Sequence, residues 1–359
     1  MNKRWLVRMG IGLCLVIAAG GCGQRKTHEI AVQKFAGVTA KKGSDPTVVY
    51  SCKDPLNSIF FICDATVPGS GAPLNGYAVG ASNTILRTAD GGKTWCRALP
   101  RNPTITPFER VLFRTSREGW AMSRDHLLCT RDCGQSWQEA QQLPEHFYYF
   151  GPCAVNSNHY FQMQPPTCSA RIYSAANAGS KWTAWGAILP RNDYAAVFFL
   201  DDQYGWVAGN YGIAAYTTNG GAAWIKQTVP KGGDLAQIQF VTPLIGWLRP
   251  VMGHEGGIWS SRDGGATWSK QDAKIKSYDS IEDMQFLNEK IGYLLVNTGH
   301  ASAEVLQTRD GGATWTIARA FKAPAHSFCF ISPSEGWLAA SDGSILRCVI
   351  ENEPHVEHP

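Results

Sequence analysis

An eight-residue phrase recurs along the chain at a nearly constant interval. The copies are TADGGKTW (88–95), TRDCGQSW (130–137), AANAGSKW (175–182), TTNGGAAW (217–224), SRDGGATW (261–268) and TRDGGATW (308–315). The tryptophans that end these six copies are 42, 45, 42, 44 and 47 residues apart. A period in the forties indicates one supersecondary unit repeated many times, and its length suits a four-stranded blade.

A second phrase, centred on Gly-Trp or Gly-Tyr, precedes each copy of the first. It reads NGYAVG (75–80), EGWAMS (118–123), NHYFQM (158–163), YGWVAG (204–209), IGWLRP (245–250), IGYLLV (291–296) and, a seventh time, EGWLAA (335–340). Short β-rich runs lie around the phrases, bounded by Gly, Asp and Asn. No unit carries the long stripe of period 3.6 that a helical solenoid requires. We therefore predict an all-β fold, a seven-bladed β-propeller with four-stranded blades.

The seventh unit ends with SDGSILRCVI (341–350), without an eight-residue phrase or a fourth strand of its own. An open ring would leave two unpaired sheet edges, which folded proteins avoid. We predict that an N-terminal strand, residues 47–52, completes the last blade. Cys52 and Cys348 would then lie on adjacent strands, which would allow a disulfide between them. The propeller would span residues 47–350, and residues 351–359 would form a disordered C-terminal tail.

The residue types of the eight-residue phrase suit a tight hairpin. The Asp or Asn side chain can accept hydrogen bonds from backbone N–H groups two residues on, and the glycines allow positive φ. The tryptophan is expected to pack into the blade. We interpret these positions as architecture: Asp90, Trp95, Asp132, Trp137, Asn177, Trp182, Asn219, Trp224, Asp263, Trp268, Asp310 and Trp315. A calcium loop would need several more oxygen ligands and a distal Glu, which the copies lack.

The copy that begins at Ser261 matches S/T-x-D-x-G-x-T/S-W at every position, so the phrase is identified as the Asp-box, or bacterial neuraminidase repeat. The third copy departs from it, with Asn177 for Asp and Lys181 for Thr. The resemblance implies boxes between the third and fourth strands, away from the catalytic face. Over residues 55–348, the alternation of a Gly-Trp strand with an Asp-box resembles the propellers related to the photosystem II assembly factor of chloroplasts and cyanobacteria. Sialidase-like and WD40/YVTN-type propellers are more distant likenesses.

The N-terminus has the layout of an export signal. Lys3, Arg4 and Arg8 precede an apolar run, residues 9–19, that is too short for a stable membrane anchor. The residues Ala19-Gly20-Gly21-Cys22 resemble the bacterial lipobox, with Ala19 where Leu is usual. The resemblance implies a lipoprotein signal peptide over residues 1–21 and a lipid on Cys22; the alternative is ordinary cleavage with Cys22 free. Either reading predicts an extracytoplasmic protein, periplasm-facing or on the cell surface.

Residues 22–46 are predicted to form a flexible basic tether. Lysine and arginine outnumber acids there by five to two, so the tether would favour anionic headgroups by about 1 kcal/mol per charge, or serve as a solvated linker. Removing residues 1–21 removes three basic residues and no acids, which changes the balance from 33 against 29 to 30 against 29. A nearly neutral chain lacks the basic excess of a nucleic-acid-binding protein.

Nine cysteines follow Cys22: Cys52, Cys63, Cys96, Cys129, Cys133, Cys153, Cys168, Cys329 and Cys348. An exported chain can form disulfides, and an odd count leaves at least one thiol unpaired or bonded to another chain. No group of cysteines and histidines has metal-ligand spacing. We therefore expect neither a metal nor a cofactor.

The loops that enter each new blade, and those after each second strand, usually form the working face of a propeller. On this face we place eight candidate binding residues: Arg101, Arg124, His146, Arg191, Asp193, His254, His300 and His326. The alternative is that they are ordinary polar loop residues and scattered histidines. Glycoside hydrolysis needs two carboxyl groups at a defined separation, and Asp193, Glu255 and Asp279 are conceivable members of such a pair. No sequence spacing pairs them, and no other catalytic motif is present.

Two functions from different classes remain. The first is a non-catalytic, lipid-anchored, monomeric propeller that binds a protein partner or acts as an assembly scaffold at the membrane surface. The alternative is a glycoside hydrolase of the sialidase or xyloglucanase kind, or a carbohydrate-binding propeller.

Overall fold

The computed structural model describes residues 48–62, 75–99, 102, 106–123, 126–140, 160–164, 171–175, 183–185, 194–229, 233–251, 257–276, 279–299 and 301–351. These residues form β-strands joined by turns, with one short 3-10 helix, η1 (Asn210–Gly212). The part of the chain so described holds no helix with the length and apolar character of a membrane span.

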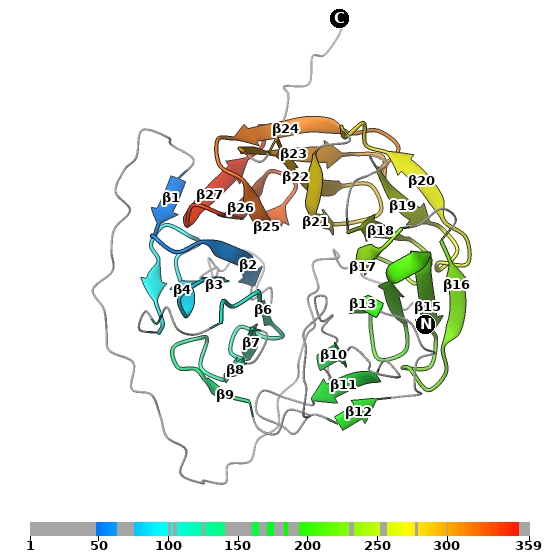
Figure 1. The fold of residues 1–359 in the computed structure, drawn as a ribbon, viewed down its shortest axis with the longest axis horizontal. Helices are drawn as coiled ribbons and strands as arrows, with labels where there is room; N and C mark the ends of the chain where they lie inside the picture. Colours follow the sequence, from blue (N-terminus) through cyan, green and yellow to red (C-terminus); the bar gives the residue numbers. More distant parts are fainter. Residues whose placement is uncertain are drawn as a thin grey trace, which may run out of the picture.

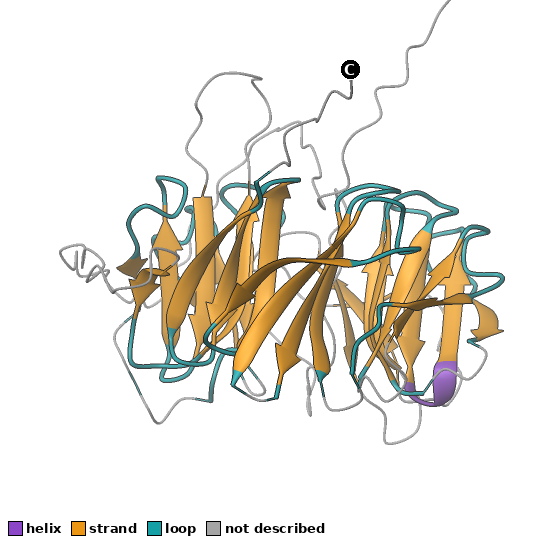
Figure 2. Ribbon diagram, turned by 90° about the horizontal axis from the view of Figure 1, so that it is seen from above, coloured by secondary structure: helices purple, strands orange, loops and turns teal. Residues whose placement is uncertain are grey.

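The strands form sheets that follow one another around a central axis (Figure 1). Five blades have four consecutive strands each, and the first two of these blades are β2 (Leu56–Ile62), β3 (Asn75–Gly80), β4 (Thr84–Thr88) and β5 (Cys96–Arg97), then β6 (Arg110–Phe113), β7 (Gly119–Met122), β8 (Leu127–Thr130) and β9 (Gln138–Glu139). The next two are β13 (Tyr194–Phe199), β14 (Gly205–Gly209), β15 (Ile213–Thr217) and β16 (Ile225–Thr228), then β17 (Leu235–Phe240), β18 (Gly246–Pro250), β19 (Gly257–Ser261) and β20 (Ser269–Asp272). The fifth is β21 (Ser280–Phe286), β22 (Gly292–Thr298), β23 (Ser302–Thr308) and β24 (Thr316–Phe321). All neighbouring strands are antiparallel, and the first strand of each blade lies nearest the axis. Seen from the side, the loops gather at the two ends of the strands (Figure 2).

The sixth four-stranded blade joins the two ends of the propeller. It contains β25 (Ala325–Ser332), β26 (Glu335–Ala340), β27 (Ser344–Val349) and, beside β27, the N-terminal strand β1 (Val48–Ser51). The predicted closure by an N-terminal strand is therefore confirmed. The strand completes the sheet because its backbone groups satisfy those of β27, which would otherwise form an exposed edge.

The disulfide considered between Cys52 and Cys348 is absent, and both are free thiols. In the antiparallel register Val48 lies opposite Leu346, and the Cys52 N–H donates to the carbonyl oxygen of Gly343 at 2.9 Å. The two cysteines therefore lie toward opposite ends of the strand pair. Each of the six cysteines in the described residues is a free thiol: Cys52, Cys96, Cys129, Cys133, Cys329 and Cys348.

Contacts between blades are built on one phenylalanine per blade. Phe286, at the end of β21, stacks face to face on Trp247 of the preceding blade at 3.5 Å between centroids, and meets the box residue Trp315 edge-on at 6.0 Å. The same stacked arrangement joins Trp337 to Phe61, Tyr77 to Phe113, Trp206 to Phe240 and Tyr293 to Phe330. The aromatic residue of the Gly-Trp phrase thus contacts the next blade, while the box tryptophan packs within its own.

The glycine of the Gly-Trp phrase makes room for this phenylalanine. A Cβ on Gly292 would lie 2.3 Å from the Phe286 ring, and a Cβ on Gly246 would lie 2.4 Å from the Phe240 ring. The third copy of the phrase has His159 at the glycine position.

The prediction of seven four-stranded blades is wrong, because the structure describes six. The remaining sheet has three strands in the described residues, β10 (Tyr160–Gln164), β11 (Arg171–Ala175) and β12 (Thr183–Trp185). Strand β10 carries most of the Gly-Trp phrase in its NHYFQM form, so the three strands correspond to the second, third and fourth strands of the other blades. Residues 141–159, which precede β10, lie outside the described residues.

Candidate functional site

Most of the predicted binding face lies outside the described residues. This applies to Arg101, Arg124, His146, Arg191, Asp193, His254 and His300, and also to Cys22, Asn177 and Trp182. The eighth residue, His326, lies at the start of β25 and is exposed. Its Nε2 lies 3.2 Å from the Ser341 hydroxyl, in the turn between β26 and β27. The convergence of the eight residues therefore stays a prediction.

Each described Asp-box is a closed hydrogen-bond network. In the box between β23 and β24, the Asp310 Oδ1 accepts from the Thr314 N–H at 2.9 Å, and its Oδ2 accepts from the Thr314 hydroxyl at 2.6 Å. The Thr308 hydroxyl donates to Asp310 at 2.8 Å and accepts from the Gly312 N–H at 2.9 Å. The carboxylate thus accepts from the N–H of the residue four positions later, whereas the sequence predicts an acceptor for the N–H two positions later. These bonds, that of the Thr314 hydroxyl first, lower the pKa of Asp310 to about 2.

The same network recurs at Asp90, Asp132 and Asp263. At Asn219 it is reduced, because Ala223 supplies a backbone N–H but no hydroxyl. Local donors thus occupy the oxygens of these box carboxylates, and their purely architectural role stays a prediction. Within the described ranges, no group of three or more His, Cys, Asp and Glu side chains could hold a metal ion.

The boxes also connect neighbouring blades, a role that the sequence did not reveal. The Trp247 indole N–H donates to the Gly311 carbonyl of the next blade at 2.9 Å, and Trp206 does the same to Gly264 at 2.8 Å. The Tyr77 hydroxyl donates to the Cys133 carbonyl at 2.9 Å. Each of these aromatic residues therefore both stacks on the next blade and hydrogen-bonds its box.

Side-chain amides occupy the innermost strands around part of the central axis. Gln239 on β17 accepts from the Phe286 N–H at 2.8 Å and donates to the Phe286 carbonyl at 2.9 Å, and Gln285 on β21 makes the same pair with Phe330. These amides pair the free backbone groups of the next innermost strand, which is an edge strand of its blade.

A buried ionic group lies beside these amides. Arg249 donates to the Ile281 carbonyl at 2.6 Å and to Gln237 Oε1 at 3.1 Å, and burial lowers its pKa to about 10. Asp283 accepts from Gln237 at 3.0 Å and from the Ser327 hydroxyl at 3.0 Å. Both charged groups are bonded to the inner strands, so they hold adjacent blades together.

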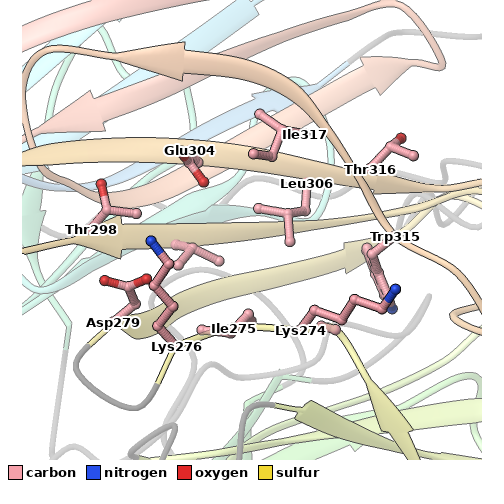
Figure 3. Close-up of a pocket in the computed structure, with 12 residues that line it drawn as sticks. Lys274, Ile275, Lys276, Asp279, Thr298, Glu304, Leu306, Trp315, Thr316 and Ile317 are labelled. Atoms are coloured by element: carbon pink, nitrogen blue, oxygen red, sulfur yellow. The ribbon is translucent and has the colours of Figure 1, made fainter.

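A groove of about 730 Å³ lies on the flank of the β21–β24 blade (Figure 3). One wall is formed by residues 273–276 and Asp279, which lie between β20 and β21, and the other by residues of β22, β23 and β24 with Trp315. The lining residues are Ala273, Lys274, Ile275, Lys276, Asp279, Val296, Thr298, Glu304, Leu306, Trp315, Thr316 and Ile317. Ile317 is 61% exposed at its rim. The groove therefore combines an apolar surface with carboxylate and ammonium groups.

Comparison with known proteins finds a family that this chain resembles. A family model described as "Photosynthesis system II assembly factor YCF48" matches residues 62–188. The chain is 23% identical over 318 residues to the photosystem II stability/assembly factor HCF136 of Arabidopsis thaliana, covering 77% of this chain and 73% of that protein. The predicted resemblance to this family of BNR-type propellers is confirmed.

Solved structures agree with the fold. The structure described as "YCF48 bound to D1 peptide" has a TM-score of 0.62 at 19% identity, covering 90% of this chain and 98% of that one. A GH74 enzyme of Niastella koreensis has a TM-score of 0.64 at 15% identity, covering 86% of this chain and 54% of that one. At these identities the likeness concerns the propeller fold alone, which unrelated functions share.

Proposed function

We propose that this chain, whose sequence resembles the YCF48 and HCF136 photosystem II assembly factors, is a non-catalytic propeller that binds a protein partner during assembly of a membrane complex. The observation that carries the proposal is the match to HCF136, which extends over 77% of the chain. That relative is named a stability/assembly factor, and the family model that matches residues 62–188 is described as an assembly factor.

The partner that we propose is a segment of a membrane protein. The solved YCF48 structure is described as bound to a D1 peptide, so a propeller of similar fold can hold a peptide. A propeller suits this role because its rigid scaffold presents loops and grooves in a fixed arrangement, which lowers the conformational entropy lost on binding.

We further propose that a lipid on Cys22 holds the propeller at the outer face of a bacterial membrane. The tether of residues 22–46 would let the ring reach its partner, and its basic residues would favour anionic lipid headgroups. A Cys22→Ser variant should then leave the membrane fraction and appear in the soluble extracytoplasmic fraction. Retention of this variant on the membrane would argue against the lipid anchor.

The test of the proposed function is purification of the tagged full-length chain from its native membrane. We expect a membrane protein to co-purify, identified by mass spectrometry. The same preparation is assayed against a panel of chromogenic glycosides, with Asp279→Asn as the matched variant. Absence of any co-purifying protein, together with glycoside turnover that this substitution abolishes, would overturn the proposal in favour of a glycoside hydrolase.

A further inference from the structure

The β2–β5 and β21–β24 blades can be compared residue by residue, because their strand registers coincide. Leu56 pairs with Gly80 as Ile281 pairs with Val296, and the irregularity that follows falls at the same place in both blades. Gly80 pairs with Thr84 as Val296 pairs with Glu304, and Leu86 pairs with Arg97 as Leu306 pairs with Ile317. By this register Asp54 corresponds to Asp279, Thr84 to Glu304 and Arg97 to Ile317.

In the β2–β5 blade this position is occupied by an arginine latch. Arg97 Nη2 on the outer strand donates to Asp54 Oδ2 at 2.9 Å and to the Thr84 hydroxyl at 2.9 Å. Asp54 is only 3% exposed. The guanidinium group thus ties the outer strand to the segment that enters the blade.

In the β21–β24 blade the arginine is missing. Ile317 cannot bond to a carboxylate, and the groove opens at this position (Figure 3). The corresponding residues in three other four-stranded blades are charged, namely Glu139, Lys226 and Lys270, while the three-stranded sheet has Ala184 there. The aliphatic side chain at the rim therefore distinguishes this blade from those three blades.

Two carboxylates remain at one end of this groove. Asp279 is 8% exposed and accepts the Gly299 N–H at 3.3 Å, and Glu304 stands on β23 where the other blade has Thr84. Figure 3 shows both residues, with Lys276, toward one end of the groove, and Trp315, Ile317 and Lys274 toward the other. An arginine at the acidic end would have two acceptors for its planar fork of N–H groups.

We propose that this groove binds an arginine side chain supplied by the partner protein, in the place that Arg97 fills within the β2–β5 blade. Apolar residues beside that arginine pack on Ile317 and Trp315. The inference rests on the proposed function, because it names the surface and the chemistry by which the partner is held. Lys276 repels the incoming charge, so the two carboxylates must outweigh it.

The probe is a fluorescein-labelled peptide, Gly-Ser-Leu-Arg-Leu-Ser-Gly, titrated with the detergent-solubilised full-length chain by fluorescence anisotropy. Replacing its arginine by citrulline should weaken binding about 10- to 100-fold, because charge-assisted hydrogen bonds are lost. The Ile317→Arg variant should rebuild the latch to Asp279 within the chain, and thereby weaken peptide binding at least about tenfold. Its thermal midpoint should equal or exceed that of the unmodified chain.

Three controls separate the groove from general effects. Ile225→Arg places the same charge on an outer strand outside the groove, at a residue that is 51% exposed, and should leave the affinity unchanged. Asp279→Asn should weaken binding while circular dichroism shows a folded chain. Lys276→Met should tighten binding a few-fold, because it removes the like charge.

Equal binding of the citrulline peptide, tighter binding of a peptide with Glu in place of Arg, or an Ile317→Arg variant with unchanged affinity would each overturn the inference. Co-purification separates this failure from that of the proposed function. If the unmodified chain and Ile317→Arg retrieve the same membrane protein, the groove assignment falls and the function stands. If the unmodified chain retrieves none, the proposed function falls, and the inference that rests on it falls too.

Discussion

Phe286, which packs against the preceding blade, offers the sharpest test of how the blades are held together. Its side chain is fully buried, stacks on Trp247 at 3.5 Å and meets Trp315 at 6.0 Å. Truncating a buried phenylalanine to alanine costs about 3–5 kcal/mol, and each aromatic pair contributes about 0.5–1.5 kcal/mol beyond burial. Phe286→Ala should therefore lower the free energy of unfolding by about 5 kcal/mol. Phe286→Leu keeps most of the volume and should lower it by about 1–3 kcal/mol.

The assay is urea unfolding followed by tryptophan fluorescence and far-UV circular dichroism. Phe60 is the matched control, since it is half-buried and its ring lies 6.4 Å from that of Phe113. Phe60→Ala should cost about half as much as Phe286→Ala, or less. If Phe286→Ala lowers the free energy of unfolding by less than about 2 kcal/mol, or if the two substitutions lower it equally, Phe286 does not hold the two blades together as argued.

Three further predictions follow from the boxes and the closure. Cys133 has a φ of 63°, a left-handed conformation that is strained for a residue with a Cβ, at a position where the DGG boxes have glycine. Cys133→Gly should therefore raise the free energy of unfolding, measured in urea, by about 0.5–1 kcal/mol. A decrease would show that the backbone at Cys133 is not strained. The pKa of Asp310 is lowered to about 2, so the stability that this carboxylate contributes is complete above the unfolded pKa near 4 and is lost as the pH falls toward 2. Thermal midpoints between pH 5 and pH 2 should fall less in Asp310→Asn than in the unmodified chain, and parallel curves would argue against it. Tyr50→Pro removes the backbone N–H of a residue in β1, so amide hydrogen exchange in β27 should accelerate; unchanged exchange would mean that β1 does not protect that edge.

The propeller and its closure could be predicted because they depend on period and on edges. The spacing of the tryptophans sets the unit, and the truncated seventh unit requires a strand from elsewhere. The three-stranded sheet of β10, β11 and β12 could not be predicted, because the phrase NHYFQM keeps its regular place in the repeat. The hydrogen bonds from Trp247 and Trp206 to the next box could not be predicted either, since they join residues that are 64 and 58 positions apart in the chain.

The candidate site divides in the same way. Loop residues such as Arg101 and His254 were chosen by their place in the repeat, and they lie outside the described residues, so their role stays a prediction. The groove was missed although its signal is present in the sequence. The second residue after the box tryptophan is charged in four of the six copies, namely Arg97, Glu139, Lys226 and Lys270, but is Ala184 in the third copy and Ile317 in the last. Only the structure shows that Arg97 reaches Asp54, and therefore what the isoleucine leaves open.

Photo-crosslinking in the native membrane, with Ile317→benzoylphenylalanine in the full-length chain, tests most directly whether the groove holds a protein partner. A protein-binding propeller that holds its partner in this groove should give a crosslink to a membrane protein at a segment that contains an arginine. The same label at Ile225, on an outer strand outside the groove, should give no such product. Equal crosslinking from both positions, or a crosslink to carbohydrate alone, would mean that the groove does not hold a protein partner.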